Sequence, residues 1–219
     1  MLQRFFAFLP LFALLLIQPA SASEMEGLKD NVAKKEAVGD VVKTGDILVD
    51  HVLGNATAPV TIIEYASLTC GHCAHFHKEI LPEVIKKYVA TGKVKILFRD
   101  FPLNALALKA AQLSQCMPED RYFPFIKTVF ENLEGWTSSA DPEATLAQYA
   151  KLAGLPGERV TSCLNDKNLQ DAIVKRRMQG ENQFKIGATP TFVVNYGQGT
   201  ITDITTFEEF DAALKKYVK

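Results

Sequence analysis

Short apolar runs alternate with helix-like segments through the middle of the chain. Residues 60–66 form a run rich in β-branched side chains, which predicts a buried strand. Residues 71–90 repeat their apolar side chains every three or four positions, as an amphipathic helix does, and Pro82 is expected to kink or divide that helix. A second strand is predicted over residues 94–98. Strand, helix and strand in this order predict a parallel pair joined by a right-handed crossover.

Helix-like segments fill most of the next part of the chain. They are expected at residues 104–116, 123–133, 142–153 and 171–184, separated by prolines and glycines. The remaining predicted elements are a strand at 191–195, a turn at 196–199, an edge strand at 200–202, a C-terminal helix at 207–218 and a first strand at 47–49. This order predicts an α/β domain with a helical insertion.

Residues 1–22 have the pattern of a cleavable export signal. Arg4 supplies the positive charge, residues 5–17 are almost wholly apolar, and Ala20-Ser21-Ala22 is a small-x-small site that places the cut after Ala22. The apolar run is short for a membrane span, although an uncleaved anchor is the alternative. Export would place the mature protein in an oxidising compartment.

Charge and cysteine content narrow the possible functions. The formal net charge of −1 gives no sign of binding to nucleic acid or to an anionic membrane surface. All four cysteines, Cys70, Cys73, Cys116 and Cys163, follow the predicted signal, and an even number in an exported chain favours disulfides. Cys116 and Cys163 form either a structural disulfide between two helices of the insertion or two unrelated buried thiols.

The sequence Cys70-Gly71-His72-Cys73 lies where the predicted strand meets the predicted helix. Two cysteines three residues apart at a helix start can close a small disulfide, and the unpaired N–H groups there favour a thiolate. We therefore expect Cys70 to be acidic and exposed, as a thiol–disulfide exchange site requires. His72 can donate a hydrogen bond or a positive charge to that thiolate, or it is a solvent-exposed spacer.

The same stretch also supplies four potential zinc ligands: Cys70, Cys73, His75 and His77. Residues two apart on a helix point to nearly opposite sides, so His75 and His77 cannot both face one ion with Cys70. We therefore predict no metal and place both histidines on exposed or groove-facing surface. No cofactor is predicted, and His51 is assigned no role.

Four segments of the chain, taken in order, resemble the bacterial DsbA-like family of thioredoxin-fold oxidoreductases. They are Gly54-Asn55-Ala56-Thr57-Ala58-Pro59-Val60, Glu64-Tyr65-Ala66-Ser67-Leu68-Thr69-Cys70-Gly71-His72-Cys73, Arg99-Asp100-Phe101-Pro102-Leu103 and Gly187-Ala188-Thr189-Pro190-Thr191-Phe192. The resemblance implies a thioredoxin fold, in which helices flank a central mixed sheet, with an inserted helical subdomain. The expected parts are a signal peptide (1–22), a flexible arm (23–45), the first part of the thioredoxin fold (46–103), the insertion (104–186) and the second part (187–219).

The resemblance also implies roles for single residues. Cys70 would be the nucleophile and Cys73 the resolving thiol of a redox-active disulfide, with a cis Thr189–Pro190 bond packed against it. Glu64 would shuttle protons to Cys73, although it could instead be a strand-end carboxylate that reaches solvent. Lys95 is the nearest counterpart of the lysine that pairs with this acid in the family.

The predicted function is that of an exported, periplasmic oxidase that introduces disulfides into unfolded proteins. The resemblance implies a DsbB-like membrane partner that reoxidises the enzyme, and we expect a monomer. Gly71-His72 between the cysteines and Thr189 before the proline resemble disulfide isomerases instead. The alternatives are therefore an isomerase or reductase of the same fold, and a redox-inactive chaperone or metal-binding module.

Overall fold

A five-stranded mixed sheet with strand order β1-β3-β2-β4-β5 forms the centre of the structure, a computed structural model that describes residues 47–219. The predicted signal peptide and N-terminal arm lie outside the described residues. The strands are β1 (Val52–Leu53), β2 (Val60–Ala66), β3 (Val94–Asp100), β4 (Thr191–Val194) and β5 (Gly199–Ile201). Strand β2 pairs in parallel with β3 and antiparallel with β4, so it lies in the middle of the sheet.

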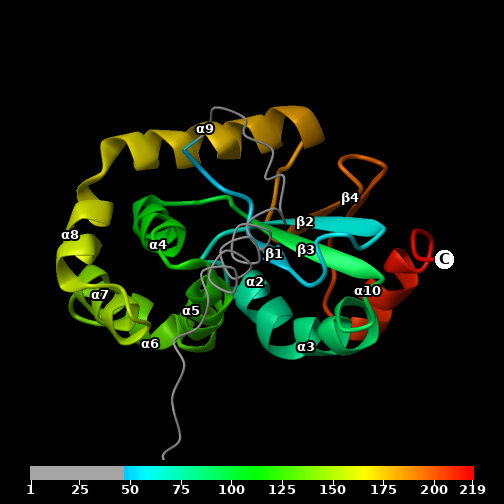
Figure 1. Ribbon diagram of the computed structural model, residues 1–219, viewed down its shortest axis with the longest axis horizontal. Helices are drawn as coiled ribbons and strands as arrows, with labels where there is room; N and C mark the ends of the chain where they lie inside the picture. The colour runs from blue at the N-terminus through cyan, green and yellow to red at the C-terminus, as the bar shows by residue number, and fades with distance from the viewer. Residues whose placement is uncertain (1–46) are drawn as a thin grey trace, which may run out of the picture. The chain divides into compact units, whose positions relative to one another are not determined.

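Every residue of β2 is buried, because helices cover both faces of the sheet. Ile62 belongs to the core cluster beneath the helix that follows β2 and beneath α10 (Phe207–Leu214). Ile63 points to the opposite face and packs in a cluster with Phe184, the last residue of α9 (Lys167–Phe184). Figure 1 shows α9 on one side of the sheet and α3 and α10 on the other. Glu64 shares the face of Ile62, because side chains two apart on a strand point the same way.

The helix after β2 is divided into segments, as Pro82 predicted. It consists of α2 (Gly71–His75), a π-helical segment (Phe76–Ile80), α3 (Leu81–Val84) and a second π-helical segment (Ile85–Val89). Pro82 lies in the first turn of α3, where its missing N–H costs no helical hydrogen bond.

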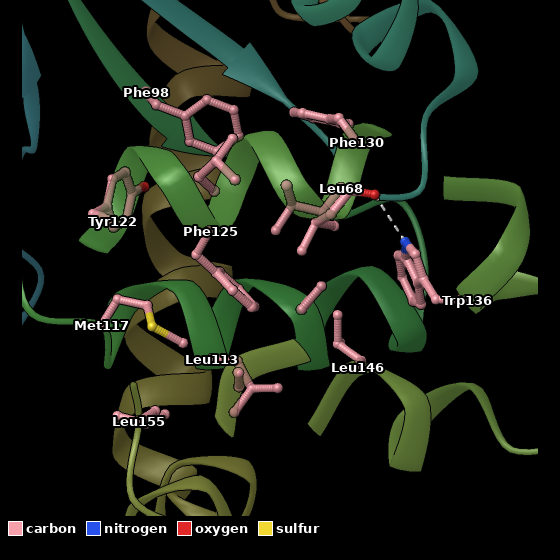
Figure 2. Close-up of a cluster of buried hydrophobic side chains, with 14 of the residues drawn as sticks. Leu68, Phe98, Leu113, Met117, Tyr122, Phe125, Phe130, Trp136, Leu146 and Leu155 are labelled. Atoms are coloured by element: carbon pink, nitrogen blue, oxygen red, sulfur yellow. Dashed lines mark hydrogen bonds between the residues drawn. The ribbon is translucent and has the colours of Figure 1, made fainter. Parts of the chain in front are cut away.

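A helical region separates β3 from β4, and its core continues into the sheet through Phe98 of β3 and Leu68 after β2. Its helices are α4 (Ala105–Gln115), α5 (Glu119–Glu131), α6 (Leu133–Thr137), α7 (Pro142–Leu152), α8 (Gly157–Asn165) and α9. Figure 2 shows the side chains that fill this core, among them Tyr122, Phe125, Phe130 and Trp136. The indole N–H of the fully buried Trp136 donates to the carbonyl of Val129 at 3.0 Å, so burial leaves this polar group satisfied.

Several local predictions differ from the structure, among them the start of α9, which lies at Lys167, and the end of α10, which lies at Leu214. Residues 47–49 are not a strand, because the carbonyls of Leu48 and Val49 accept hydrogen bonds from the Arg176 side chain instead of from a neighbouring strand. Helix α5 begins at Glu119 and not at residue 123. The prediction started too late because the charged first turn of this helix carries no apolar signal. Helix α8 was not predicted, because its buried side chains are confined to Val160 and the pair Cys163 and Leu164. No helix within residues 47–219 is long and apolar enough to cross a membrane.

Candidate active site

Cys70 is the N-cap residue of α2, directly after the loop that leaves β2. Its backbone is extended, and its sulfur accepts a hydrogen bond from the backbone N–H of Cys73 at 3.4 Å. The side chain is partly exposed, whereas that of Cys73 is fully buried. Both thiols are free in this structure. The loop after β2 therefore ends where the sulfur of Cys70 meets the N–H groups of the helix start.

The two thiols have opposite acidities. The pKa of Cys70 is lowered to about 5, first by a hydrogen bond from the Cys73 side chain, then by the Thr189 side chain and by backbone N–H groups of Cys73 and His72; together they outweigh the opposing effect of burial. Burial raises the pKa of Cys73 far above its usual range, and the negative charges of Cys70 and Glu64 raise it further. The reduced site therefore holds a thiolate on the accessible sulfur and a protonated thiol beneath it.

We expect the thiolate absorbance of the reduced protein to titrate with a midpoint near pH 5, compared with 9.0 for an unperturbed cysteine. Because the pKa is depressed in the folded state, the thiolate stabilises the reduced fold above about pH 9, and this contribution declines as the pH falls to about 5. Cys73→Ala removes the largest cause of the shift, so the midpoint should rise in this variant. An ultraviolet pH titration checks both values, and a wild-type midpoint above about 8 would contradict the assignment.

The loop before β4 passes beside Cys70. The Thr189–Pro190 peptide bond is cis, as the resemblance implied, and the Cys70 thiol donates to the Thr189 carbonyl at 3.3 Å. The hydroxyl of Thr191 donates to the carbonyl of Ala188 at 2.7 Å and closes this loop. The hydroxyl of Thr189 is also buried, and it contributes to lowering the pKa of Cys70. Two segments far apart in the sequence therefore meet at the reactive sulfur.

His72 contributes to the site through its backbone. Its side chain is exposed, and its backbone N–H donates the hydrogen bond that helps to lower the pKa of Cys70. A direct role of the imidazole in stabilising the thiolate stays a prediction.

Glu64 is buried in the middle of the sheet and does not reach solvent. Its side chain is 1% exposed, and the Nε2 atom of His77 lies 3.0 and 3.1 Å from its two carboxylate oxygens. The prediction that His77 lies on the surface is wrong, since its side chain is only 6% exposed. Lys95 is not the partner of Glu64, because its ammonium group donates to the Ala56 carbonyl. The cationic neighbour that a buried carboxylate needs was sought among the lysines, but a histidine supplies it.

His75 points away from this pair. Its Nε2 atom lies 2.8 Å from the carbonyl oxygen of Thr205, on the segment before α10, and its side chain is exposed. The two histidines therefore face different partners, as their helical spacing indicated.

Cys116 and Cys163 form a disulfide with a Cα–Cα distance of 6.4 Å. It joins the end of α4 to α8, two elements of the insertion, in the arrangement expected for a structural bridge. The side-chain N–H₂ of Gln112 donates to the Cys163 carbonyl at 2.9 Å and adds a second link between these helices.

Polar residues that the sequence analysis did not use link the chain before β1 to the insertion. Asp50 accepts hydrogen bonds from Arg99 at 2.6 and 3.0 Å and from Arg176 at 3.2 Å. His51 stacks on Tyr122 with ring centroids 3.6 Å apart, and its Nδ1 atom lies 2.7 Å from a carboxylate oxygen of Glu119. These contacts have a structural role, because they connect β3, α5 and α9 to the start of the described chain.

Comparisons with known proteins agree with this fold. Residues 47–216 match the family model described as thioredoxin. The crystal structure of Wolbachia pipientis alpha-DsbA1 is 34% identical, has a TM-score of 0.70 and aligns over 76% of this chain and 89% of that one. BdbD from Bacillus subtilis shares the fold, with a TM-score of 0.65 and 24% identity over 76% of this chain and 91% of that one.

A curated relative from Rickettsia felis, provisionally named a protein-disulfide oxidoreductase, is 32% identical over 161 residues. The alignment covers 72% of this chain and 58% of the relative. The chain therefore spans less than two thirds of the length of this relative.

Proposed function

Because this chain belongs to the DsbA-like disulfide oxidoreductases of the thioredoxin family, we propose that it introduces disulfides into unfolded proteins by exchange at Cys70 and Cys73. The observation that carries this proposal is the stabilised thiolate of Cys70. Whatever stabilises the reduced site makes its disulfide a stronger oxidant, because the reduced form is the product of the reaction. Cys70 is also the more accessible of the two sulfurs, so it is the one that a protein substrate can reach.

The reaction runs in two exchanges. A substrate thiolate attacks the sulfur of Cys70, the Cys70–Cys73 bond breaks, and Cys73 leaves with the electron pair and takes up a proton. A second thiolate of the substrate then attacks the substrate sulfur of the mixed disulfide, and Cys70 leaves as a thiolate. The substrate loses two electrons and gains a disulfide, and the enzyme ends with both cysteines reduced. Glu64, whose charge acts on Cys73, serves as the group that exchanges the proton with this buried thiol.

The surroundings of Cys70 suit an extended peptide. The Thr189–Pro190 loop offers backbone groups beside the reactive sulfur, which would bind a substrate main chain whatever its sequence. Leu103 is 53% exposed, and the neighbouring Asn104 donates to the hydroxyl of Thr69 at 3.1 Å, which holds this loop next to Cys70. Unfolded, apolar segments of reduced proteins are therefore the substrates we propose.

The export signal predicted at residues 1–22 would bring the enzyme to the periplasm, where we propose that it acts as a monomer. The reduced enzyme would pass its two electrons to a DsbB-like membrane protein. A disulfide isomerase or reductase is the second candidate. It is favoured by Thr189 beside Cys70 and by Gly71-His72 between the cysteines, which is the dipeptide typical of isomerases.

The reduction potential of the Cys70–Cys73 pair separates these two functions. After equilibration with glutathione buffers and alkylation, mass spectrometry can quantify this pair separately from Cys116 and Cys163. We expect a reduction potential of about −120 mV, the value of a strong oxidant, because the Cys70 thiolate is stabilised. A potential of about −200 mV or lower would overturn the oxidase proposal in favour of an isomerase or reductase.

A further inference from the structure

Glu64 and His77 form a buried pair on the strand and the helix that lead into and out of the redox site. Glu64 is on the central strand, where its register partners are Phe98 on β3 and Phe192 on β4. A carboxylate among such neighbours is unfavourable without a hydrogen-bonded cationic partner. His77 meets this need, because its Nε2 atom lies within 3.1 Å of both carboxylate oxygens.

Aromatic rings hold the imidazole of His77 in this position. Its centroid lies 4.4 Å from that of Phe130 on α5, and 5.8 Å from those of Phe98 on β3 and Phe76 on its own helix. None of these rings carries a charge, and the side chain has little access to water. The carboxyl group of Glu64 is therefore the polar partner that His77 faces across this contact, and the ring cannot easily turn away from it.

The pair is coupled to the resolving thiol. The negative charge of Glu64 is one of the causes that raise the pKa of Cys73, so this thiol responds to the charge of the carboxylate. His77 follows Cys73 by four residues on the same helix, a spacing that brings side chains to one face. Cys73 is thus linked to Glu64 through electrostatic interaction, and Glu64 is linked to His77 through the close contact of its carboxylate with the imidazole.

We propose that His77 is a positioning residue for thiol exchange, which holds the Glu64 carboxylate beside Cys73 and carries the proton that Glu64 exchanges with this thiol. When Cys73 leaves as a thiolate, the Glu64 carboxylate accepts a proton from the protonated His77 ring and passes it to the sulfur of Cys73. When Cys73 attacks a mixed disulfide, the proton moves back along the same groups. Atoms and charge balance in both directions, since one proton moves among three groups. This inference rests on the proposed function.

A chromogenic disulfide separates the two thiols in one experiment. When the reduced protein reacts with 5,5′-dithiobis(2-nitrobenzoate), the attack of Cys70 releases a first thionitrobenzoate. The attack of Cys73 on the resulting mixed disulfide releases a second. We expect His77→Gln to leave the first release within about twofold of wild type and to slow the second about tenfold, with an altered pH profile of the second rate. Gln keeps a hydrogen-bond donor but cannot carry the proton.

His75→Gln is the matched control, because it makes the same substitution two residues away at an exposed position. Both of its rates should equal those of wild type. Glu64→Gln and the double variant Glu64→Gln/His77→Gln should be equally slow in the second release, because His77 acts through Glu64. If His77→Gln alone does not fold, the double variant replaces it in the measurement, because it leaves no unpaired buried charge.

The outcomes distinguish this inference from the proposed function. If the wild type shows both releases and His77→Gln does not change the second one, the role of His77 is refuted and the oxidoreductase proposal stands. An equal slowing of both releases in His77→Gln would also refute it, because a general disturbance of the fold has that effect. If Cys70 of the wild type does not react at all, the proposed function itself fails.

Discussion

Replacing Cys70 with alanine should abolish thiol exchange. The variant lacks the partly exposed sulfur whose thiolate is stabilised at the start of α2. Cys73 cannot substitute for Cys70, because the Cys73 thiol is buried and its pKa is raised far above the usual range. We expect the rate at which a reduced peptide with two cysteines is oxidised to fall at least about 10⁴-fold, to the uncatalysed level. Mass spectrometry of the peptide after timed acid quenching measures this rate.

Cys73→Ala is the informative companion variant. It retains Cys70, so it should still attack a disulfide-bonded peptide, but it cannot release the product and should accumulate a stable mixed disulfide. The covalent adduct is visible as a mass increase that a reductant reverses. Adduct formation by Cys70→Ala, or full oxidase activity in that variant, would show that Cys70 is not the nucleophile.

Removing the Cys116–Cys163 bridge should destabilise the protein by about 4 kcal/mol without altering the chemistry of Cys70. The bridge joins residues separated by 47 positions, so it removes considerable chain entropy from the unfolded state. Urea unfolding of Cys116→Ala/Cys163→Ala, compared with wild type, measures the loss. The thiolate titration of Cys70 in the folded variant should keep its midpoint near pH 5.

The single variant Cys116→Ala tests whether the bond itself matters. It breaks the same bridge, so it should lose nearly as much stability as the double variant. A loss below about 1 kcal/mol in both variants would contradict a stabilising role. A shifted Cys70 titration in a folded protein would show that the insertion acts on the site.

The strands that position Cys70 could be predicted because their signals are local. The β-branched run 60–66 and the apolar run 94–98 correspond to β2 and β3, which pair in parallel as the crossover rule required. The helix after β2 could be predicted for the same reason, since Phe76, Ile80 and Val84 repeat at helical spacing and lie on one buried face. The acidity expected of Cys70 follows from the same boundary between strand and helix.

The pairing of Glu64 with His77 could not be predicted from local pattern. It joins a strand to a helix, and it depends on how the helix lies against the sheet and on the burial supplied by Phe130 of α5. A histidine next to the apolar Phe76 was therefore interpreted as surface. The segment around Leu48 was misjudged for a related reason, because Arg176 from α9 satisfies backbone groups that a neighbouring strand would otherwise bind.

Burying an ion pair has a consequence for engineering this enzyme. Exchanging a buried pair for well-packed apolar side chains is often neutral or stabilising by about 1–4 kcal/mol. A selection for heat resistance alone would therefore tend to discard Glu64 and His77, whereas a selection for catalytic turnover would retain them. Under the proton-transfer role proposed for Glu64 and His77, stability and activity are opposed at these two positions, so a thermostable and active version of the enzyme has to gain its stability elsewhere in the fold.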